Sequence, residues 1–306
     1  MSFINNLIDV HALAARVPNG AKLAVAKDES GVAMAVTREL VRRGVRGLHL
    51  VTVPVGGLQA DVLIGAGCVA TLESSGVTLS EFGTGPCFTR AVKAGAITLR
   101  DATCPAIYAG LQAAQKGLPF MPLRGIIGSD LLAHRDDWRI IDNPFASANT
   151  GGTNASTAAL DKIVAIAAIQ PDVALFHAPL ADRFGNVFIG RQRELMLLAH
   201  ASKQTLVTVE QIVEGNLLED DARSGAVIPA LYIEAIAHAP RGAWPLNYGD
   251  AYPLDAAWMR TYVAMARTAD GFESLVAQWL AGSDALKPLV GAGLVNKANL
   301  KTGVPA

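Results

Sequence analysis

The sequence predicts an α/β fold: an open, mostly parallel sheet covered by helices on both faces, with a helical C-terminal extension. Short apolar runs rich in β-branched residues alternate with helical patterns, which is typical of parallel sheets with helical crossovers. The runs are apolar throughout, as expected of strands buried on both faces. A hydrophobic content of 51% against 17% charged residues favours a large core over disorder. We find no internal repeat and expect one domain over residues 1–306.

Strands are expected where apolar, β-branched residues cluster between turn signals. In chain order they are Lys22–Ala26, Leu48–Val53, Val62–Ile64, Ile97–Leu99, Ile163–Ala167, Val173–Phe176 and Thr205–Val209.

Helices are expected where the apolar spacing is helical and glycine, proline or basic residues mark an end. In chain order they are Asn5–Val17, Val32–Arg43, Pro86–Lys93, Ala106–Lys116 and Glu194–Ala201. Pro18-Asn19-Gly20, Gly44 and Gly117 mark the ends of three of them. The tail, residues 250–306, should add helices at Asp255–Thr268 and Phe272–Leu280, and the stretch Asn143–Thr157 predicts a loop or insert.

The charge balance excludes electrostatic partners. Twenty-six basic and 27 acidic residues give a net charge of −1, so we expect no binding to nucleic acid or to a membrane surface. No apolar run reaches the ~18 residues of a membrane span, and the start shows no signal peptide. Three cysteines far apart in sequence indicate a reducing compartment. We therefore expect a cytoplasmic protein.

Several familiar motifs are absent or incomplete. Gly65-Ala66-Gly67-Cys68-Val69-Ala70 matches a dinucleotide fingerprint, but no long helix follows it and no acidic residue ends a next strand. A tight turn is the better interpretation. The six histidines show no zinc spacing and no G-x-S-x-G elbow occurs, so we expect neither a metal site nor an α/β-hydrolase triad.

Three places carry candidate chemistry. Glu73 follows the Gly-x-Gly turn and is flanked by hydroxyls; a structural glutamate is the alternative. Cys104 precedes a proline at a predicted helix start, where a thiol pKa can fall, or it is an inert packed cysteine. Arg124 lies in a proline-rich stretch, Leu118 to Gly125, that suits a rigid ligand-lining loop.

The segment from Pro171 to Gly190 starts as a buried strand and then places polar residues at the strand end. These are His177, the pair Asp182-Arg183 and the turn residues Gly185-Asn186. Ligands collect at the carboxyl ends of strands in open α/β sheets. The alternatives are a structural histidine, a solvated charge pair and a tight turn.

Five blocks in order resemble the class I coenzyme A transferases, specifically the A (alpha) subunit of the glutaconate type. They are ADVLIGAGCV, FGTGPCFTRAVKAG, GLQAAQKGLPFMPLRGIIGSDLL, PDVALFHAPLADRFGNVFIG and TLVTVEQIV. The H-A-x-x-A-D-x-x-G-N block and the following T-V-E are the most specific. The glycine-rich segment that usually follows the first strand is reduced here to Gly31.

The resemblance implies the family's fold and a two-subunit enzyme. The A and B subunits share one α/β fold, with the active site between them, and move coenzyme A from an acyl-CoA to a carboxylic acid. In the family the nucleophilic glutamate lies on the B subunit, so we expect this chain to supply no catalytic residue. If it does supply one, Glu73 is the candidate. Coenzyme A is a substrate and no cofactor is bound permanently. His177 becomes packing or hydrogen-bonding support. The residues that the resemblance implies nearest the acyl group are Glu73, Ser74, Ser75, Gly76, Thr103 and Cys104. We add Gly67 and Arg124 to the predicted CoA- or acyl-binding residues.

Three alternatives stay open. Related A subunits include ring-cleaving hydrolases of CoA-linked cyclic diketones, which use a glutamate of their own where Asp101-Ala102-Thr103-Cys104-Pro105 stands here. A cysteine at about that place favours the transferase. The second is a non-catalytic binding protein on the same fold, and the third is a nicotinamide enzyme that uses Gly65 to Ala70.

Overall fold

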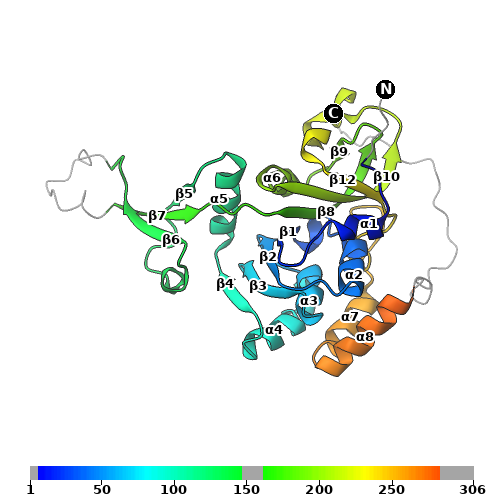
Figure 1. Ribbon diagram of the computed structural model, residues 1–306, viewed down its shortest axis with the longest axis horizontal. Helices are drawn as coiled ribbons and strands as arrows, with labels where there is room; N and C mark the ends of the chain where they lie inside the picture. The colour runs from blue at the N-terminus through cyan, green and yellow to red at the C-terminus, as the bar shows by residue number, and fades with distance from the viewer. Residues whose placement is uncertain (1–5, 147–160, 283–306) are drawn as a thin grey trace.

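The computed structural model describes residues 6–146 and 161–282, and it confirms the predicted fold class. The nine-stranded main sheet has a parallel core in the order β12-β10-β8-β1-β2-β3-β4 (Figure 1). A short antiparallel hairpin joins β8 to β9, and β11 extends it. The strands are β1 Lys22–Ala26, β2 Leu48–Val53, β3 Val69–Ser74, β4 Thr98–Asp101, β8 Val173–Asp182, β9 Val187–Phe188, β10 Gln204–Val213, β11 Val227–Ile228 and β12 Ala235–His238.

Helices cover both faces of this sheet because side chains alternate along each strand. On β1, Leu23 faces one core and Ala24 the other. The first core includes residues of α1 Val10–Ala15, α2 Met34–Arg42 and α3 Leu58–Gly65, and α4 Pro86–Lys93 packs against it through partly buried side chains. The second includes residues of α5 Cys104–Gln115 and α6 Arg193–Ala201.

The C-terminal helices are α7 Ala256–Met265 and α8 Ala269–Ala281. Their aromatic side chains, Trp258 and Tyr262 among them, pack with Met34 of α2 and Leu58 of α3 in a third core cluster. The Tyr262 hydroxyl also donates a 2.6 Å hydrogen bond to the buried carboxylate of Asp61. The tail therefore packs against the helices of the first face.

A second, antiparallel sheet projects from the body at the far end of α5 (Figure 1). Its order is β5-β7-β6, with β5 Phe120–Leu123, β6 Trp138–Asp142 and β7 Lys162–Ala167. The short 3₁₀ helix η3, Asp130–His134, lies between β5 and β6. We call residues 118–146 and 161–168 the arm. One face of the arm, with Val164 and Ile166 fully buried, packs into the second core.

The strand predicted at Val62–Ile64 is wrong, because these residues lie in α3. Seven of the eight α3 residues, Leu58 to Ile64, are buried. A short helix that is buried on all sides, with the polar Gln59 and Asp61 also buried, shows no apolar stripe of 3.6-residue period, and its short apolar run then reads as a buried strand. The true strand is β3, a few residues later.

Two other expectations also need correction, and a third is not tested. The loop-rich middle contains β5 and β6, so the strand predicted at Ile163–Ala167 joins the arm rather than the main sheet. The first helix begins at Val10, because the Asp9 side chain accepts a 2.7 Å hydrogen bond from the Ala12 N–H and caps it there. Most of the Asn143–Thr157 insert lies outside the described residues.

Within residues 6–146 and 161–282, no helix is long and apolar enough to cross a membrane.

Candidate functional site

Polar side chains gather where β2, β3 and β4 end. These strands are parallel neighbours, so their carboxyl ends share one edge of the sheet. The Ser75 hydroxyl donates a 2.8 Å hydrogen bond to the Pro54 carbonyl after β2. It also lies 3.2 Å from the Cys104 thiol after β4. We call Ser74, Ser75, Gly76, Thr103 and Cys104 the carboxyl-end cluster.

Ser74 holds the backbone of this cluster in place. Its side chain is fully buried, 2.5 Å from the Thr52 hydroxyl, and it donates to the Gly76 carbonyl at 2.7 Å. Gly76 has φ +136°, which favours glycine at this turn. Ser74 therefore shapes the turn, while Ser75 and Gly76 remain partly exposed.

Cys104 is the first residue of α5, and its position follows from helix capping. Thr103 is the N-cap, and its hydroxyl accepts a 3.3 Å hydrogen bond from the Ala106 N–H. The Cys104 side chain is partly exposed, whereas Cys68 and Cys87 are buried. Burial raises the pKa of both buried thiols, that of Cys87 to about 12. Cys104, a member of the cluster, is therefore the accessible thiol of the three.

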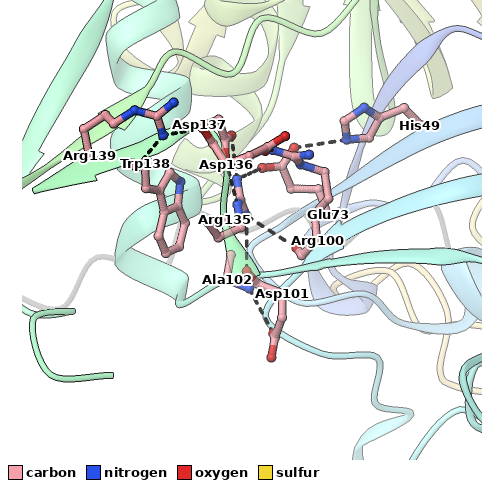
Figure 2. A network of polar contacts seen from close by, with 10 residues as sticks. All are labelled: His49, Glu73, Arg100, Asp101, Ala102, Arg135, Asp136, Asp137, Trp138 and Arg139. Atoms are coloured by element: carbon pink, nitrogen blue, oxygen red, sulfur yellow. Dashed lines mark hydrogen bonds and ion pairs between the residues drawn. The ribbon is translucent and has the colours of Figure 1, made fainter. Parts of the chain in front are cut away.

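Glu73 lies one residue before the cluster, but its carboxylate is buried and paired. Only 2% of its side chain is exposed. One oxygen is 2.5 Å from Nη2 of Arg135, and the other is 3.1 Å from Nε2 of His49 (Figure 2). Burial alone would raise the pKa of Glu73, but His49 and Arg135 outweigh it, and the pKa is lowered. Glu73 is therefore a charged carboxylate whose two oxygens already contact Arg135 and His49.

Arg135 is the centre of this network, and the sequence analysis missed it. Its side chain is 1% exposed and bridges both oxygens of Asp137 at 2.9 Å. It also donates to the Asp101 carbonyl at 3.2 Å and lies 4.2 Å from the centre of the Trp138 ring. Figure 2 shows these side chains converging between the arm and β3 and β4. Arg135 therefore joins the base of the arm to the strand that leads to Cys104.

Two of the predicted site residues lie outside the cluster. Gly67 follows α3 at φ +68°, before β3 begins, so the whole of β3 separates it from Ser75. Arg124 follows β5 in the arm, is exposed, and forms an ion pair with Asp161. The structure brings together Ser74, Ser75, Gly76, Thr103 and Cys104 but groups neither Gly67 nor Arg124 with them.

Asp28 is a further acidic group at this edge, just after β1. Its two oxygens accept hydrogen bonds of 2.9 and 3.0 Å from the Leu58 N–H at the start of α3. Burial raises its pKa to about 7, partly offset by the Leu58 hydrogen bond. Gly57 is required beside it, because a Cβ there would lie 2.0 Å from the Asp28 carboxylate. Asp28 occupies the N-terminus of α3, where an anionic ligand could otherwise bind.

The polar residues from Pro171 to Gly190 are structural. His177 is fully buried, with Nδ1 2.8 Å from the Thr208 hydroxyl and Nε2 2.7 Å from Glu210. Asp182 is also buried and accepts hydrogen bonds from the backbone N–H groups of Phe184, Asn186 and Leu217. Asp182 is thus not part of a solvated charge pair.

Among the described residues, no group of three or more His, Cys, Asp or Glu side chains could hold a metal ion.

Comparisons with known proteins agree on one family. The family model described as "Coenzyme A transferase" matches residues 8–239. The cholesterol ring-cleaving hydrolase IpdA subunit of Rhodococcus jostii (strain RHA1) is 30% identical, covering 82% of this chain and 83% of the relative. The A subunit of the 3-oxoadipate CoA-transferase of Pseudomonas knackmussii is also 30% identical, covering 81% and 84%. The crystal structure of glutaconate coenzyme A-transferase from Acidaminococcus fermentans superposes with a TM-score of 0.79 at 26% identity, covering 90% and 89%.

Proposed function

Because this chain belongs to the coenzyme A transferase family, as an A subunit of the glutaconate type, we propose that it works in a two-subunit CoA-transferase. The enzyme moves coenzyme A from an acyl-CoA to a carboxylic acid. A glutamate of the B subunit forms the covalent intermediate, and this chain supplies walls of the site.

The reaction is covalent catalysis by a carboxylate. The glutamate attacks the thioester carbonyl, which forms an acyl-glutamyl anhydride and releases the CoA thiolate. The thiolate then attacks the glutamyl carbonyl, which gives a glutamyl-CoA thioester and frees the first acid. The acceptor carboxylate repeats the two steps in reverse and leaves as its CoA ester. Each tetrahedral step needs N–H or O–H donors for the oxyanion.

The burial of Glu73 carries the assignment of the nucleophile to the partner. A nucleophilic carboxylate must reach the thioester, whereas Glu73 is 2% exposed and both of its oxygens have partners. The pKa of Glu73 is lowered because His49 and Arg135 contact its carboxylate, so the carboxylate is charged but not free to attack a substrate. The carboxyl-end cluster next to it offers hydroxyl, thiol and backbone groups, which suit a wall around an acyl group.

Within this site we assign positioning roles. Ser75 and Gly76 at the end of β3, and Cys104 at the start of α5, line the edge where the partner's glutamate would arrive. The Ser75 hydroxyl donates to Pro54 and is held in one orientation.

A borohydride trapping experiment tests the proposal. Borohydride reduces a glutamyl-CoA thioester to an alcohol, which marks the glutamate that carried CoA. The purified complex is incubated with a panel of acyl-CoAs and then with borohydride, with a sample lacking acyl-CoA as control. We expect the modified peptide to come from the unlike subunit, in wild type and in Glu73→Gln alike. A modified peptide that contains Glu73, and is lost in Glu73→Gln, refutes the assignment.

The 30% identity to a ring-cleaving hydrolase subunit supports a second candidate, in which the complex cleaves a carbon–carbon bond of a CoA-linked cyclic diketone. The two candidates differ in what they need. The transferase exchanges CoA only when an acceptor acid is added, whereas the hydrolase consumes its substrate with water alone. Mass spectrometry of products with and without an isotope-labelled acceptor acid separates them.

A further inference from the structure

A second carboxylate, that of Glu194, lies at the edge of the sheet that carries the carboxyl-end cluster. Glu194 is the second residue of α6 and is partly exposed. It is anchored by Ser30, which follows β1 and is fully buried, and whose hydroxyl donates a hydrogen bond to Oε1 of Glu194. Because β1 is parallel to β2, Ser30 stands at the same edge as the cluster. A negative side chain in the first turn of a helix also interacts favourably with the helix dipole.

The other carboxylate oxygen of Glu194 is uncommitted. Within the described part of the chain, Oε2 of Glu194 has no hydrogen bond and no ion pair. This distinguishes Glu194 from Glu73, whose two oxygens both have partners. Glu194 also lines an open hollow of about 430 Å³ between α5 and α6. A carboxylate with one anchored and one open oxygen beside a hollow can accept a proton from a bound molecule.

Tyr108 lines the same hollow from α5 and connects it with the cluster. It lies four residues after Cys104, so the two side chains stand on one face of the helix. Burial, and then the negative charges that Glu194 and Cys104 can carry, raise the pKa of Tyr108, so its hydroxyl stays protonated. Among the residues that the structure describes, none accepts a hydrogen bond from this hydroxyl. A phenol donor therefore lies near both the carboxylate of Glu194 and the thiol of the cluster.

A carboxylate base beside a hydrogen-bond donor is the arrangement that enolisation requires. The base removes a proton from the carbon next to a carbonyl group, and the electron pair of that C–H bond moves onto the carbonyl oxygen. The donor stabilises the negative charge that develops on this oxygen. A carboxylate is a weak base, so a second carbonyl must make the carbon acidic, as in a β-oxoacyl thioester. CoA transfer itself moves no carbon-bound proton, so this chemistry is additional to it.

We propose that Glu194 is an acid–base residue that reversibly deprotonates the α-carbon of a β-oxoacyl-CoA bound at the carboxyl-end cluster, with Tyr108 donating to the thioester oxygen. The proton passes from the carbon to Oε2 of Glu194 and returns from it, so no other reactant is consumed. The inference rests on the proposed function only for the binding of an acyl-CoA at the cluster.

Hydrogen exchange at the α-carbon tests the proposal. The complex with the unlike transferase subunit of the same host is incubated in heavy water with acetoacetyl-CoA or with butyryl-CoA, which lacks the second carbonyl. No acceptor acid is added, and mass spectrometry follows the deuterium content of each thioester. We expect the complex to exchange the α-hydrogens of acetoacetyl-CoA roughly 100-fold or more faster than buffer alone, and those of butyryl-CoA at the buffer rate. Exchange of acetoacetyl-CoA at the buffer rate overturns the proposal.

Variants identify the base. Glu194→Gln keeps an oxygen that can accept from Ser30, and it should lower the exchange rate by about 100-fold. Tyr108→Phe should lower it by about 10-fold or more, because the donor to the enolate oxygen is lost. Glu273→Gln, at an exposed glutamate of α8, is the matched control and should exchange like wild type. Exchange that survives in Glu194→Gln but is lost in Cys104→Ser shows that the thiol is the base, which refutes the assignment.

The rate of CoA transfer separates a base from a residue that only supports the site. Transfer is measured from butyryl-CoA to acetate, after circular dichroism has shown that the variants are folded. If Glu194 is the base, Glu194→Gln should lower exchange about 10-fold or more beyond any loss of transfer. Equal losses of exchange and transfer contradict the proposal. If Glu194→Gln does not fold, the comparison of the two thioesters and Tyr108→Phe decide.

The outcomes also separate this inference from the proposed function. A complex that exchanges the α-hydrogens of acetoacetyl-CoA but transfers no CoA keeps the acid–base residue and refutes the transferase. A complex that transfers CoA without exchange keeps the transferase and refutes the acid–base residue.

Discussion

Replacing Arg135 with methionine should destabilise the fold strongly. The change removes the charge that neutralises Glu73, whose side chain is 2% exposed, and leaves His49 as the remaining partner of that carboxylate. Breaking one side of a buried ion pair costs about 3–5 kcal/mol, because an uncompensated charge stays buried. The contacts of Arg135 with Asp137 and the Asp101 carbonyl are lost as well. We therefore expect Arg135→Met at the upper end of that range.

The double variant Arg135→Met with Glu73→Gln makes the argument specific. Removing both charges removes the cause of the penalty, so the double variant should be more stable than Arg135→Met alone. Arg139→Met, at an exposed arginine of the same arm, is the matched control and should stay within about 0.5 kcal/mol of wild type.

The free energy of unfolding is measured by urea unfolding, monitored by circular dichroism at one pH near neutrality. The proteins are wild type, Arg135→Met, Glu73→Gln, the double variant and the Arg139→Met control. The free energies of unfolding form a double-mutant cycle, and the coupling between positions 73 and 135 should exceed about 1 kcal/mol. If the two changes add, or if Arg135→Met costs no more than Arg139→Met, then the pair does not contribute as we argue.

Three further predictions concern single groups. The pKa of Asp28 is about 7 when folded, against an ordinary value of 3.8, so its ionisation opposes folding as pH rises between these values. The Tm of Asp28→Asn relative to wild type should therefore rise from pH 4 to pH 8, and a constant difference contradicts this. Cys104 should react first with Ellman's reagent, because the other two thiols are buried; a fast phase that survives in Cys104→Ser would disagree. Asp182→Ala should lower the free energy of unfolding by about 3 kcal/mol or more, because it leaves buried N–H donors unpaired. Thermal or urea unfolding measures this loss, and a loss under about 1 kcal/mol would show that these donors find other partners.

Elements that carry their own local signals were predicted closely. The bounds of β1, β2 and α4 agree with the sequence prediction. Here the strands are runs of apolar residues bounded by turns, and Pro86 begins a helix that Gly95 follows. Where burial is complete on all sides, as along α3, that periodic signal disappears.

The site divides in the same way. The sequence indicated the segments after β3 and β4, because serine, glycine, threonine and cysteine stand there between apolar runs. It could not indicate that Glu73 is bound to Arg135, which lies 62 residues away in a stretch that reads as a loop. It also grouped Gly67 with Glu73 by closeness along the chain, although a whole strand separates Gly67 from the cluster.

By itself, the sequence determined the order of most strands and helices and the family to which the chain belongs. Both depend on short-range residue patterns, which are the same whatever the rest of the chain does. Only the tertiary structure decided that Glu73 is buried and that Arg124 sits on a projecting arm. Burial and pairing depend on which distant segments meet, and the energy of a charge is set by those neighbours and not by its position in the chain.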